Sequence, residues 1–301
     1  MNRISRVLAA IDFSKPARSA FEYALALSKQ HGAELVVVQA VPPDQPFGWH
    51  ARDRYALTVT LRRRAEQSNV EFTDRVQTGD PAEIILLHAR SLCPDVIVLG
   101  THQRRGIARL RAGSVAERII AKATVPVLLV PRGRQTSTIK PFNHVAAAVD
   151  LGPSTNRVVE QALALAKDPT DRITLLHVVS PLSSRVPAHL YGYGIPESQD
   201  PLIRDAEQYL QLAVPVKRST AAAIHTRVFH GNTTTEINRA VGRIGADLLV
   251  VGVPKRGVVS RALFGSTAAR LLRTIRVPIL AVPDVGTASA HQESSSLQSA
   301  A

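Results

Sequence analysis

Two glycine-led segments are the part of the sequence whose residue types and spacing could do chemistry. Residues 100–114 read GTHQRRGIARLRAGS and residues 252–266 read GVPKRGVVSRALFGS, so in each a glycine is followed by twelve residues and then Gly-Ser. The free backbone N–H groups at a helix start attract an anion, and a glycine lets a phosphate approach closely. Both segments are therefore candidate phosphate-binding loops. The candidate residues are Gly100, Arg104, Gly113 and Ser114 in the first segment and Gly252, Lys255, Arg256, Gly265 and Ser266 in the second.

The same residues also have a purely structural interpretation. Ser114 followed by Glu117 is a capping box, which explains a serine at that place without any ligand. The second segment has Ala269 where Glu117 would fall, so this explanation is weaker for Ser266. Arginines on a surface are commonly just solvated charge, and the two interpretations stay open at this point.

Each candidate loop lies between an apolar run and a helical pattern, and the two alternate along the chain. Short apolar runs are typical of strands buried on both faces, and Gly32 is a typical helix end. The first copy predicts strands at 7–11, 35–38, 72–77, 96–99 and 127–130, and helices at 14–32, 52–68, 81–92 and 114–122. Strands separated by helices predict a parallel sheet with right-handed crossovers, covered on both faces.

The ends of these strands add further candidate residues. Ligands of open parallel sheets bind at the carboxyl ends of the strands, where connectivity reverses direction. Asp12 and Ala40 follow or end the first two strands, and Asp150 and Val178 are their counterparts later in the chain. The aspartates could hydrogen bond to a nucleotide, or they could cap the helices that follow.

The chain is an internal duplication. Residues 7–12 (VLAAID) reappear 138 positions later as residues 145–150 (VAAAVD), and Gly100 reappears 152 positions later as Gly252. The second copy therefore carries 152 − 138 = 14 extra residues, located between Val179 and Gly231. We predict two domains at 1–132 and 143–284, a linker at 133–142 and a disordered tail at 285–301.

Composition excludes several classes of protein. The 301 residues include 45% hydrophobic and 20% charged residues, which is an ordinary globular mixture. No apolar stretch approaches the roughly 20 residues that cross a bilayer, so we expect a cytoplasmic protein without a membrane span. Cys93 is the only cysteine, which excludes a disulfide framework, and between Leu92 and Pro94 we expect it to be a small core residue. No histidine pair has zinc-binding spacing, and His102 has Pro254 as its counterpart, which argues against a duplicated catalytic histidine.

A formal charge of +13 suits anionic partners in general. Arg62, Arg63 and Arg64 form a local basic run, but aromatic residues make up only 4% of the chain and no nucleic-acid reader motif is present. We therefore expect only weak, salt-sensitive and sequence-independent association with nucleic acid.

The order and spacing of six short segments of the chain resemble the universal stress protein family in its tandem two-domain form. The resemblance covers residues 4–131 and 143–283, and it is carried by the following segments. They are residues 7–12, 79–84 (GDPAEI), 125–131 (VPVLLVP), 145–150, 175–179 (LLHVV) and 245–252 (GADLLVVG). The family fold that this implies is α/β: two tandem doubly wound domains of adenine-nucleotide alpha-hydrolase type, each a five-stranded parallel sheet flanked by helices.

The resemblance also implies a ligand, ATP or a related adenine nucleotide. ATP-binding members have a glycine, two residues, a second glycine, nine residues and then Gly-Ser or Gly-Thr. Here the middle glycine is replaced by Gln103 and Lys255. A side chain there could occupy phosphate space, whereas Lys255 could instead neutralise a phosphate, which slightly favours the second copy. Asp12 and Asp150 match the family aspartate on the adenine side, but the glycine that usually follows is Phe13 and Leu151 here.

Two hypotheses about function follow. The first is a non-enzymatic stress-response protein with adenine nucleotide as ligand, and weak ATPase activity is not ruled out. The alternative is a degenerate tandem scaffold that acts through protein, lipid or weak nucleic-acid contact. The resemblance further implies that the last strands of the two domains, 127–130 and 279–282, pair within the chain as a pseudo-dimer, and it leaves room for a further homodimer.

Overall fold

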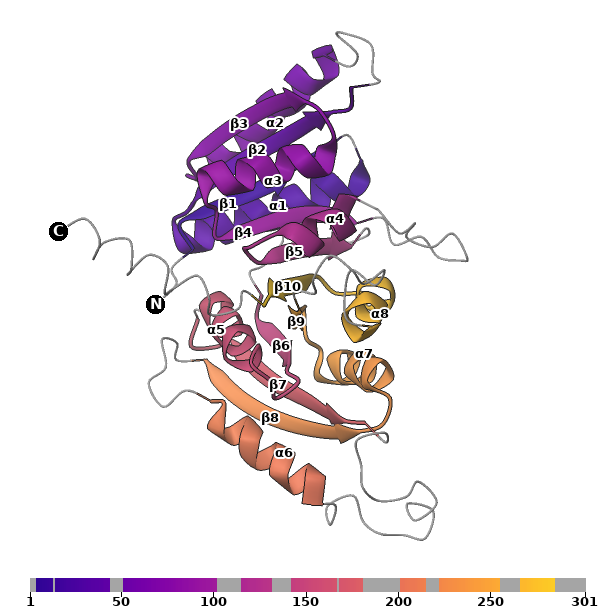
Figure 1. Cartoon of the computed structure of the whole chain (residues 1–301). Coiled ribbons are helices and arrows are strands. Elements are labelled where there is room, and N and C mark those ends of the chain that lie inside the picture. Colours follow the sequence, from indigo (N-terminus) through magenta and orange to yellow (C-terminus); the bar gives the residue numbers. More distant parts are fainter. Residues whose placement is uncertain are drawn as a thin grey trace, which may run out of the picture.

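A single sheet of ten strands runs through the molecule. The structure is a computed structural model that describes residues 4–12, 14–43, 51–101, 115–131, 142–166, 168–180, 201–214, 222–254 and 266–284. The sheet order is β3-β2-β1-β4-β5-β10-β9-β6-β7-β8, so each half of the chain contributes five neighbouring strands. Figure 1 shows the two halves one above the other, joined where β5 meets β10.

The first half alternates strands and helices as the sequence predicts. Its elements are β1 (Arg6–Ala10), α1 (Lys15–His31), β2 (Glu34–Val41), α2 (Ala51–Gln67), β3 (Phe72–Thr78), α3 (Pro81–Leu92), β4 (Val96–Thr101), α4 (Val115–Lys122) and β5 (Val127–Pro131). All strand pairs within this half are parallel. The predicted α/β class and five-stranded parallel sheet are therefore confirmed.

The second half repeats this scheme. Its elements are β6 (His144–Ala148), α5 (Thr155–Leu165), β7 (Arg172–Val179), α6 (Pro201–Leu212), β8 (Ala223–His230), α7 (Thr233–Ile244), β9 (Leu248–Val253), α8 (Ser266–Thr274) and β10 (Ile279–Pro283). Leu35 pairs with Phe72 in the first half, and the equivalent Ile173 pairs with Ile224 in the second. The 14 extra residues are thus absorbed between β7 and β8 without a change of register.

The helix ends follow from local chemistry. The Ser14 side chain accepts a hydrogen bond from the backbone N–H of Ala17 at 3.2 Å, which caps the start of α1. Gly32 ends the helix in the left-handed conformation with φ 61°. In the same way, Asp80 caps α3 and Asn232 caps α7. The starts of α1, α3 and α7 are therefore set by residues that the sequence displays.

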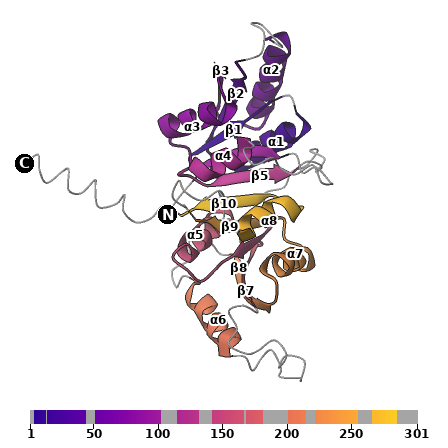
Figure 2. The same cartoon turned by 45° about the vertical axis from the view of Figure 1, so that its right-hand side comes forward.

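The two halves are joined by antiparallel pairing of their last strands, as the sequence predicts. Leu128 of β5 lies opposite Leu280 of β10, and Val127 lies opposite Ala281. Figure 2 shows the two strands side by side from a second direction. The pairing removes two sheet edges that would otherwise be exposed and apolar, so the outer edges of the sheet are β3 and β8.

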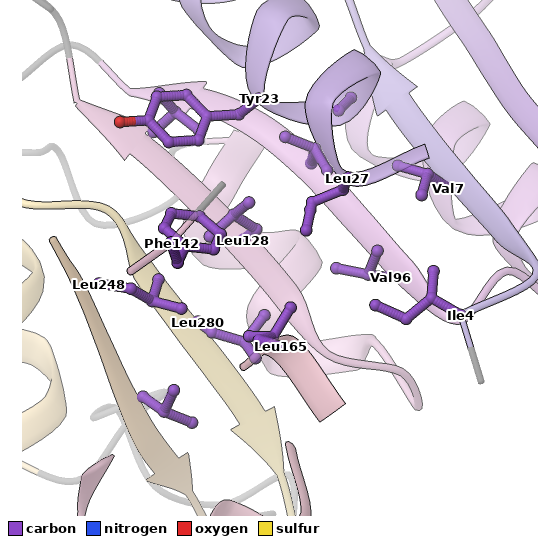
Figure 3. Close-up of a cluster of buried hydrophobic side chains, with 14 of the residues drawn as sticks. Ile4, Val7, Tyr23, Leu27, Val96, Leu128, Phe142, Leu165, Leu248 and Leu280 are labelled. Carbon is purple, nitrogen blue, oxygen red and sulfur yellow. The ribbon is translucent and has the colours of Figure 1, made fainter. Parts of the chain in front are cut away.

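One hydrophobic core crosses this seam. On one face of the sheet, buried residues from α1 and α5 pack with Leu128 and Leu280 in a single cluster. Figure 3 shows part of it, with Tyr23 and Phe142 near the seam strands. The rings of these two residues stack, with centroids 5.5 Å apart. Phe142 is only 3% exposed, so this residue, which the sequence places at the end of the linker, belongs to the core that the two halves share.

The opposite face of the seam carries one ion pair. Arg273 of α8 lies 3.7 Å from Glu117 of α4, and the Glu117 side chain is 9% exposed. By the 152-residue offset, Glu117 corresponds to Ala269 and Arg273 to Ala121, and both alanines pack against the same apolar cluster as α4 and α8. The seam is therefore close to a twofold arrangement in its strands, but not in its charges.

Three other expectations have different outcomes. Cys93 is exposed rather than buried, because it follows the last residue of α3 as its C-cap in the left-handed conformation (φ 46°), so the prediction of a core cysteine is wrong. Within the described part of the chain, no helix is long and apolar enough to cross a membrane. The predicted linker residues 133–141 and the predicted disordered tail at 285–301 lie outside the described residues.

Candidate functional site

The carboxyl edge of each half-sheet brings the predicted strand-end residues together. β1 lies between β2 and β4, and Ala10 at its end is in register with Val38 and Leu99. Asp12 follows β1, and Ala40 and Gly100 lie near the ends of β2 and β4, so all three are on one edge of the sheet. In the second half, Ala148 is in register with Leu176 and Val251, which places Asp150, Val178 and Gly252 in the same arrangement.

The two aspartates are exposed and held by local hydrogen bonds. Oδ1 of Asp12 accepts from the N–H of Ser14 at 2.8 Å. Oδ1 of Asp150 accepts from the N–H of Gly152 at 2.9 Å and from the hydroxyl of Ser154 at 3.3 Å. Among the described residues, no group donates to the other carboxylate oxygen of either aspartate. Among the described residues, each half thus has an oriented carboxylate at the strand edge with one oxygen that accepts no hydrogen bond.

The interpretation of these aspartates as helix caps is wrong. The cap position of α1 is Ser14, and that of α5 is Ser154. Asp12 and Asp150 lie before those residues, in the turn that leaves the strand. They orient this turn and do not accept hydrogen bonds from the first turn of the helix.

The glycines that end β4 and β9 have a packing role of their own. A Cβ atom on Gly100 would lie 2.4 Å from the carbonyl carbon of Pro16 and 2.7 Å from the nitrogen of Ala17. A Cβ atom on Gly252 would lie 2.9 Å from Oγ of Ser154. In both halves the start of the first helix therefore rests directly on the glycine, which explains a glycine there whether or not a ligand binds.

Leu151 adopts a backbone conformation that favours glycine. Its φ is 59°, in the left-handed region, where a non-glycine residue costs roughly 1–2 kcal/mol. It follows Asp150, at the position where the family usually has glycine. Its side chain packs against Val179 and Ile203, and this contact offsets part of that strain.

The strand-end residues Ala40 and Val178 lie where the sequence predicts. Ala40 pairs with Gln77 and Val178 with Phe229, so both are integral members of their sheets. The next residue of each strand, Val41 or Val179, accepts a hydrogen bond from the N–H of the glycine that follows β3 or β8, at 2.8 and 3.0 Å. Sequence reasoning did not single out Val41 or its neighbour Val76, an apolar side chain that is 51% exposed at this edge.

The phosphate-loop residues are mostly beyond the part of the chain that is described. Arg104, Gly113, Ser114, Lys255, Arg256 and Gly265 lie outside the described residues. Ser266 is the first residue of α8, as expected for a serine at a helix start. Ser114 is not described, so the capping box is not tested, and its predicted partner Glu117 takes part in the ion pair across the seam.

The titratable groups with perturbed pKa values include a network that begins at Asp80, two residues after the end of β3. Arg118 of α4 bonds to Asp80 at 2.7 Å and lowers the pKa of that carboxyl. Lys122 and Arg118 together lower the pKa of Glu83, and Lys122 makes the larger contribution. This network joins α3 to α4 and is structural. Among the described residues, no group of three or more histidine, cysteine or acidic side chains is placed to hold a metal ion.

Comparison with known proteins identifies the family of both halves. The model of the universal stress protein family matches residues 3–131 and 141–283. A universal stress protein of Methanocaldococcus jannaschii is 27% identical over 146 residues, which are 44% of this chain and 86% of the relative. One from Thermus aquaticus is 35% identical over 133 residues, which are 41% of this chain and 96% of the relative.

A solved structure shares the whole arrangement. The crystal structure of a universal stress protein from Archaeoglobus fulgidus has a TM-score of 0.69 at 16% identity, covering 92% of this chain and 96% of that one. At this identity the likeness concerns the fold. With its two family matches in tandem, the chain belongs to the universal stress protein family.

Proposed function

We propose that the protein is a non-enzymatic stress-response factor that binds ATP or a related adenine nucleotide at the carboxyl edge of its half-sheets. The observation that carries this proposal is the placement of Asp12 and Asp150 at equivalent points of the two halves, each with one carboxylate oxygen that accepts from no group among the described residues. Such an oxygen can accept from a ribose hydroxyl or a base amino group. Each aspartate follows a strand that neighbours the one leading into a Gly-x12-Gly-Ser loop.

The phosphates would be held by these loops. Ser266 opens α8, and the amides of Gly265 and Ser266, the Ser266 hydroxyl and the cationic side chain of Lys255 or Arg256 would form the second cradle. The first cradle would use Arg104, Gly113 and Ser114. We place the protein in the cytoplasm, since its exposed single thiol suits a reducing compartment.

The first experiment asks whether a nucleotide binds at all. Purified protein would be denatured and its supernatant analysed for adenine nucleotide, and the melting temperature would be measured with and without ATP. Bound nucleotide, or a melting temperature that rises with ATP concentration, supports the proposal. The alternative, a scaffold without nucleotide, predicts neither result.

Two substitutions then test the second cradle. Loss of one charged phosphate hydrogen bond costs about 1.5–3 kcal/mol, or roughly 10- to 150-fold in affinity, so Ser266→Ala should weaken ATP binding by that factor. Lys255→Gly restores the residue of ATP-binding family members. Tighter binding would mean that Lys255 blocks the site, and weaker binding that it contacts phosphate. If neither substitution changes affinity, this loop holds no phosphate.

A further inference from the structure

The two halves differ at the corner of the sheet formed by the ends of the second and third strands. In the second half this corner, at the ends of β7 and β8, is covered by the first turns of α6. Ile203 and Ala206 pack there against Val179 in a separate apolar cluster, and all three residues are at most 7% exposed. Val228 and Leu151 pack against the same cluster. The second half thus fills its corner with its own side chains.

In the first half, the described residues leave the equivalent corner more exposed. Val41 and Val76 correspond to Val179 and Val228, but Val41 is only half-buried and Val76 is 51% exposed. Both lie on the face of the sheet that carries α2. Gln39 is in register with Val76, precedes Val41 by two residues, and bonds to Thr58 of α2 at 2.8 Å. Two neighbouring valines are therefore left accessible on a carboxyl edge.

The sequences of α2 and α6 explain why the two corners differ in exposure. Leu61 of α2 and Leu210 of α6 are both buried against the amino-terminal part of the sheet. Seven residues before each leucine, α6 has Ile203, whereas α2 has Arg54. An arginine at that place does not supply the apolar cover that isoleucine gives. Accordingly, α6 packs along both β7 and β8, while α2 packs mainly against β3.

The more exposed corner adjoins the aspartate of its own half. The N–H of Ile11 donates to the carbonyl oxygen of Val38 at 3.0 Å, which keeps the chain leading into Asp12 beside the end of β2. The edge of the first half therefore combines an apolar surface with a carboxylate oxygen that accepts from no group among the described residues. A planar heteroaromatic ring suits this combination, because its faces are apolar and its rim carries hydrogen-bonding groups.

We infer that the nucleotide base binds in the first half alone, on the corner made by Val41 and Val76, and that Ile203 and Ala206 close the equivalent corner of the second half. This inference rests on the proposed function and specifies which of its two sites takes the base. It opposes the preference for the second half that Lys255 suggests, so one experiment separates the two.

Photolabelling of the full-length chain locates the base. 8-Azido-ATP would be crosslinked in the presence and absence of excess ATP, and the labelled peptides mapped by mass spectrometry alongside a calorimetric stoichiometry. We expect one nucleotide per chain and ATP-competable label within residues 34–78. Two nucleotides per chain, or label within residues 172–230, would overturn the inference while leaving the proposed function intact. No competable label and no calorimetric binding would overturn both.

Matched substitutions test the residues themselves. Valine to threonine keeps the shape and replaces a methyl group by a hydroxyl, so the pair Val41→Thr and Val76→Thr should raise the Kd for ATP about tenfold. Val228→Thr makes the same change in the second half, and we expect the Kd to stay within twofold. Circular dichroism would confirm that both proteins are folded. An equal effect of the two variants, or none from the first, contradicts the inference.

Discussion

Gly100→Ala should destabilise the protein far more than the equivalent change Gly252→Ala. An added Cβ at Gly100 would lie 2.4 Å from the carbonyl carbon and 2.6 Å from the carbonyl oxygen of Pro16. Carbon atoms in contact are normally about 3.5–4.0 Å apart, so the start of α1 would have to retreat by about 1 Å. That segment cannot easily retreat, because Ala17 is 3% exposed. Overpacking costs about 1–3 kcal/mol, and because the added Cβ would meet backbone atoms rather than a flexible side chain, we expect about 3 kcal/mol here.

At Gly252 the obstacle is a side chain. The added Cβ would meet Oγ of Ser154 at 2.9 Å and its Cβ at 3.3 Å. The hydroxyl can rotate away and gives up only a 3.3 Å hydrogen bond to Asp150. We therefore expect Gly252→Ala to cost about 1 kcal/mol. Gly242 in α7 has nothing within 4 Å of an added Cβ, and Gly242→Ala is a control that should stabilise by about 0.5–1 kcal/mol.

Urea denaturation followed by circular dichroism measures these differences. The reasoning predicts a gap of about 2 kcal/mol between Gly100→Ala and Gly252→Ala. Equal stabilities within 0.5 kcal/mol would refute it, since the close approach of α1 would then not be what requires the glycine. If Gly100→Ala kept its stability and lost affinity for ATP, the glycine would serve the ligand instead.

Three further predictions concern the seam, a buried histidine and the thiol. Leu280→Asp buries an unpaired charge opposite Leu128 and should lower the free energy of unfolding by more than about 4 kcal/mol. It should also increase the radius of gyration in small-angle scattering. Leu212→Asp, at an exposed site, is the control and should change the free energy of unfolding by less than about 0.5 kcal/mol. Burial lowers the pKa of His144 below its usual 6.5, so the unfolded chain binds more protons and the urea midpoint should fall as pH drops below about 6.5. His144→Gln should make that fall shallower, and an unchanged slope would contradict the assignment. Cys93 should react with one equivalent of a water-soluble thiol reagent in the native protein, and reaction only after denaturation would contradict its exposure.

The repeat explains why so much of the fold follows from the sequence. Strands buried on both faces, such as β1 and β9, contain continuous apolar runs, and each run recurs in the other half, at an offset of 138 residues for β1 and 152 for β9. Helix boundaries marked by Ser14 and Gly32 come from short-range chemistry. Both signals are local, so neither depends on knowing what lies across the sheet.

Long-range contacts are the part that sequence patterns did not show. Phe142 stacks on Tyr23, 119 positions earlier (142 − 23), and no local pattern connects the two. Cys93 is flanked by apolar neighbours, yet the left-handed turn at the end of α3 directs its side chain outward. Val76 has the composition of a buried strand residue, and its exposure depends on where α2 packs. The candidate site differs between the halves for the same reason.

The ion pair between Arg273 and Glu117 across the seam has a consequence for how the two halves evolve. In a dimer of identical chains every contact occurs twice, so a substitution must suit both of its surroundings at once. Two copies of the first half would place Glu117 opposite Ala121, and two copies of the second would place Arg273 opposite Ala269. Only the fused chain pairs Glu117 with Arg273 at one of the two equivalent positions and leaves Ala121 and Ala269 at the other. Covalent linkage thus allows each half to change at the seam without an identical change in the other half.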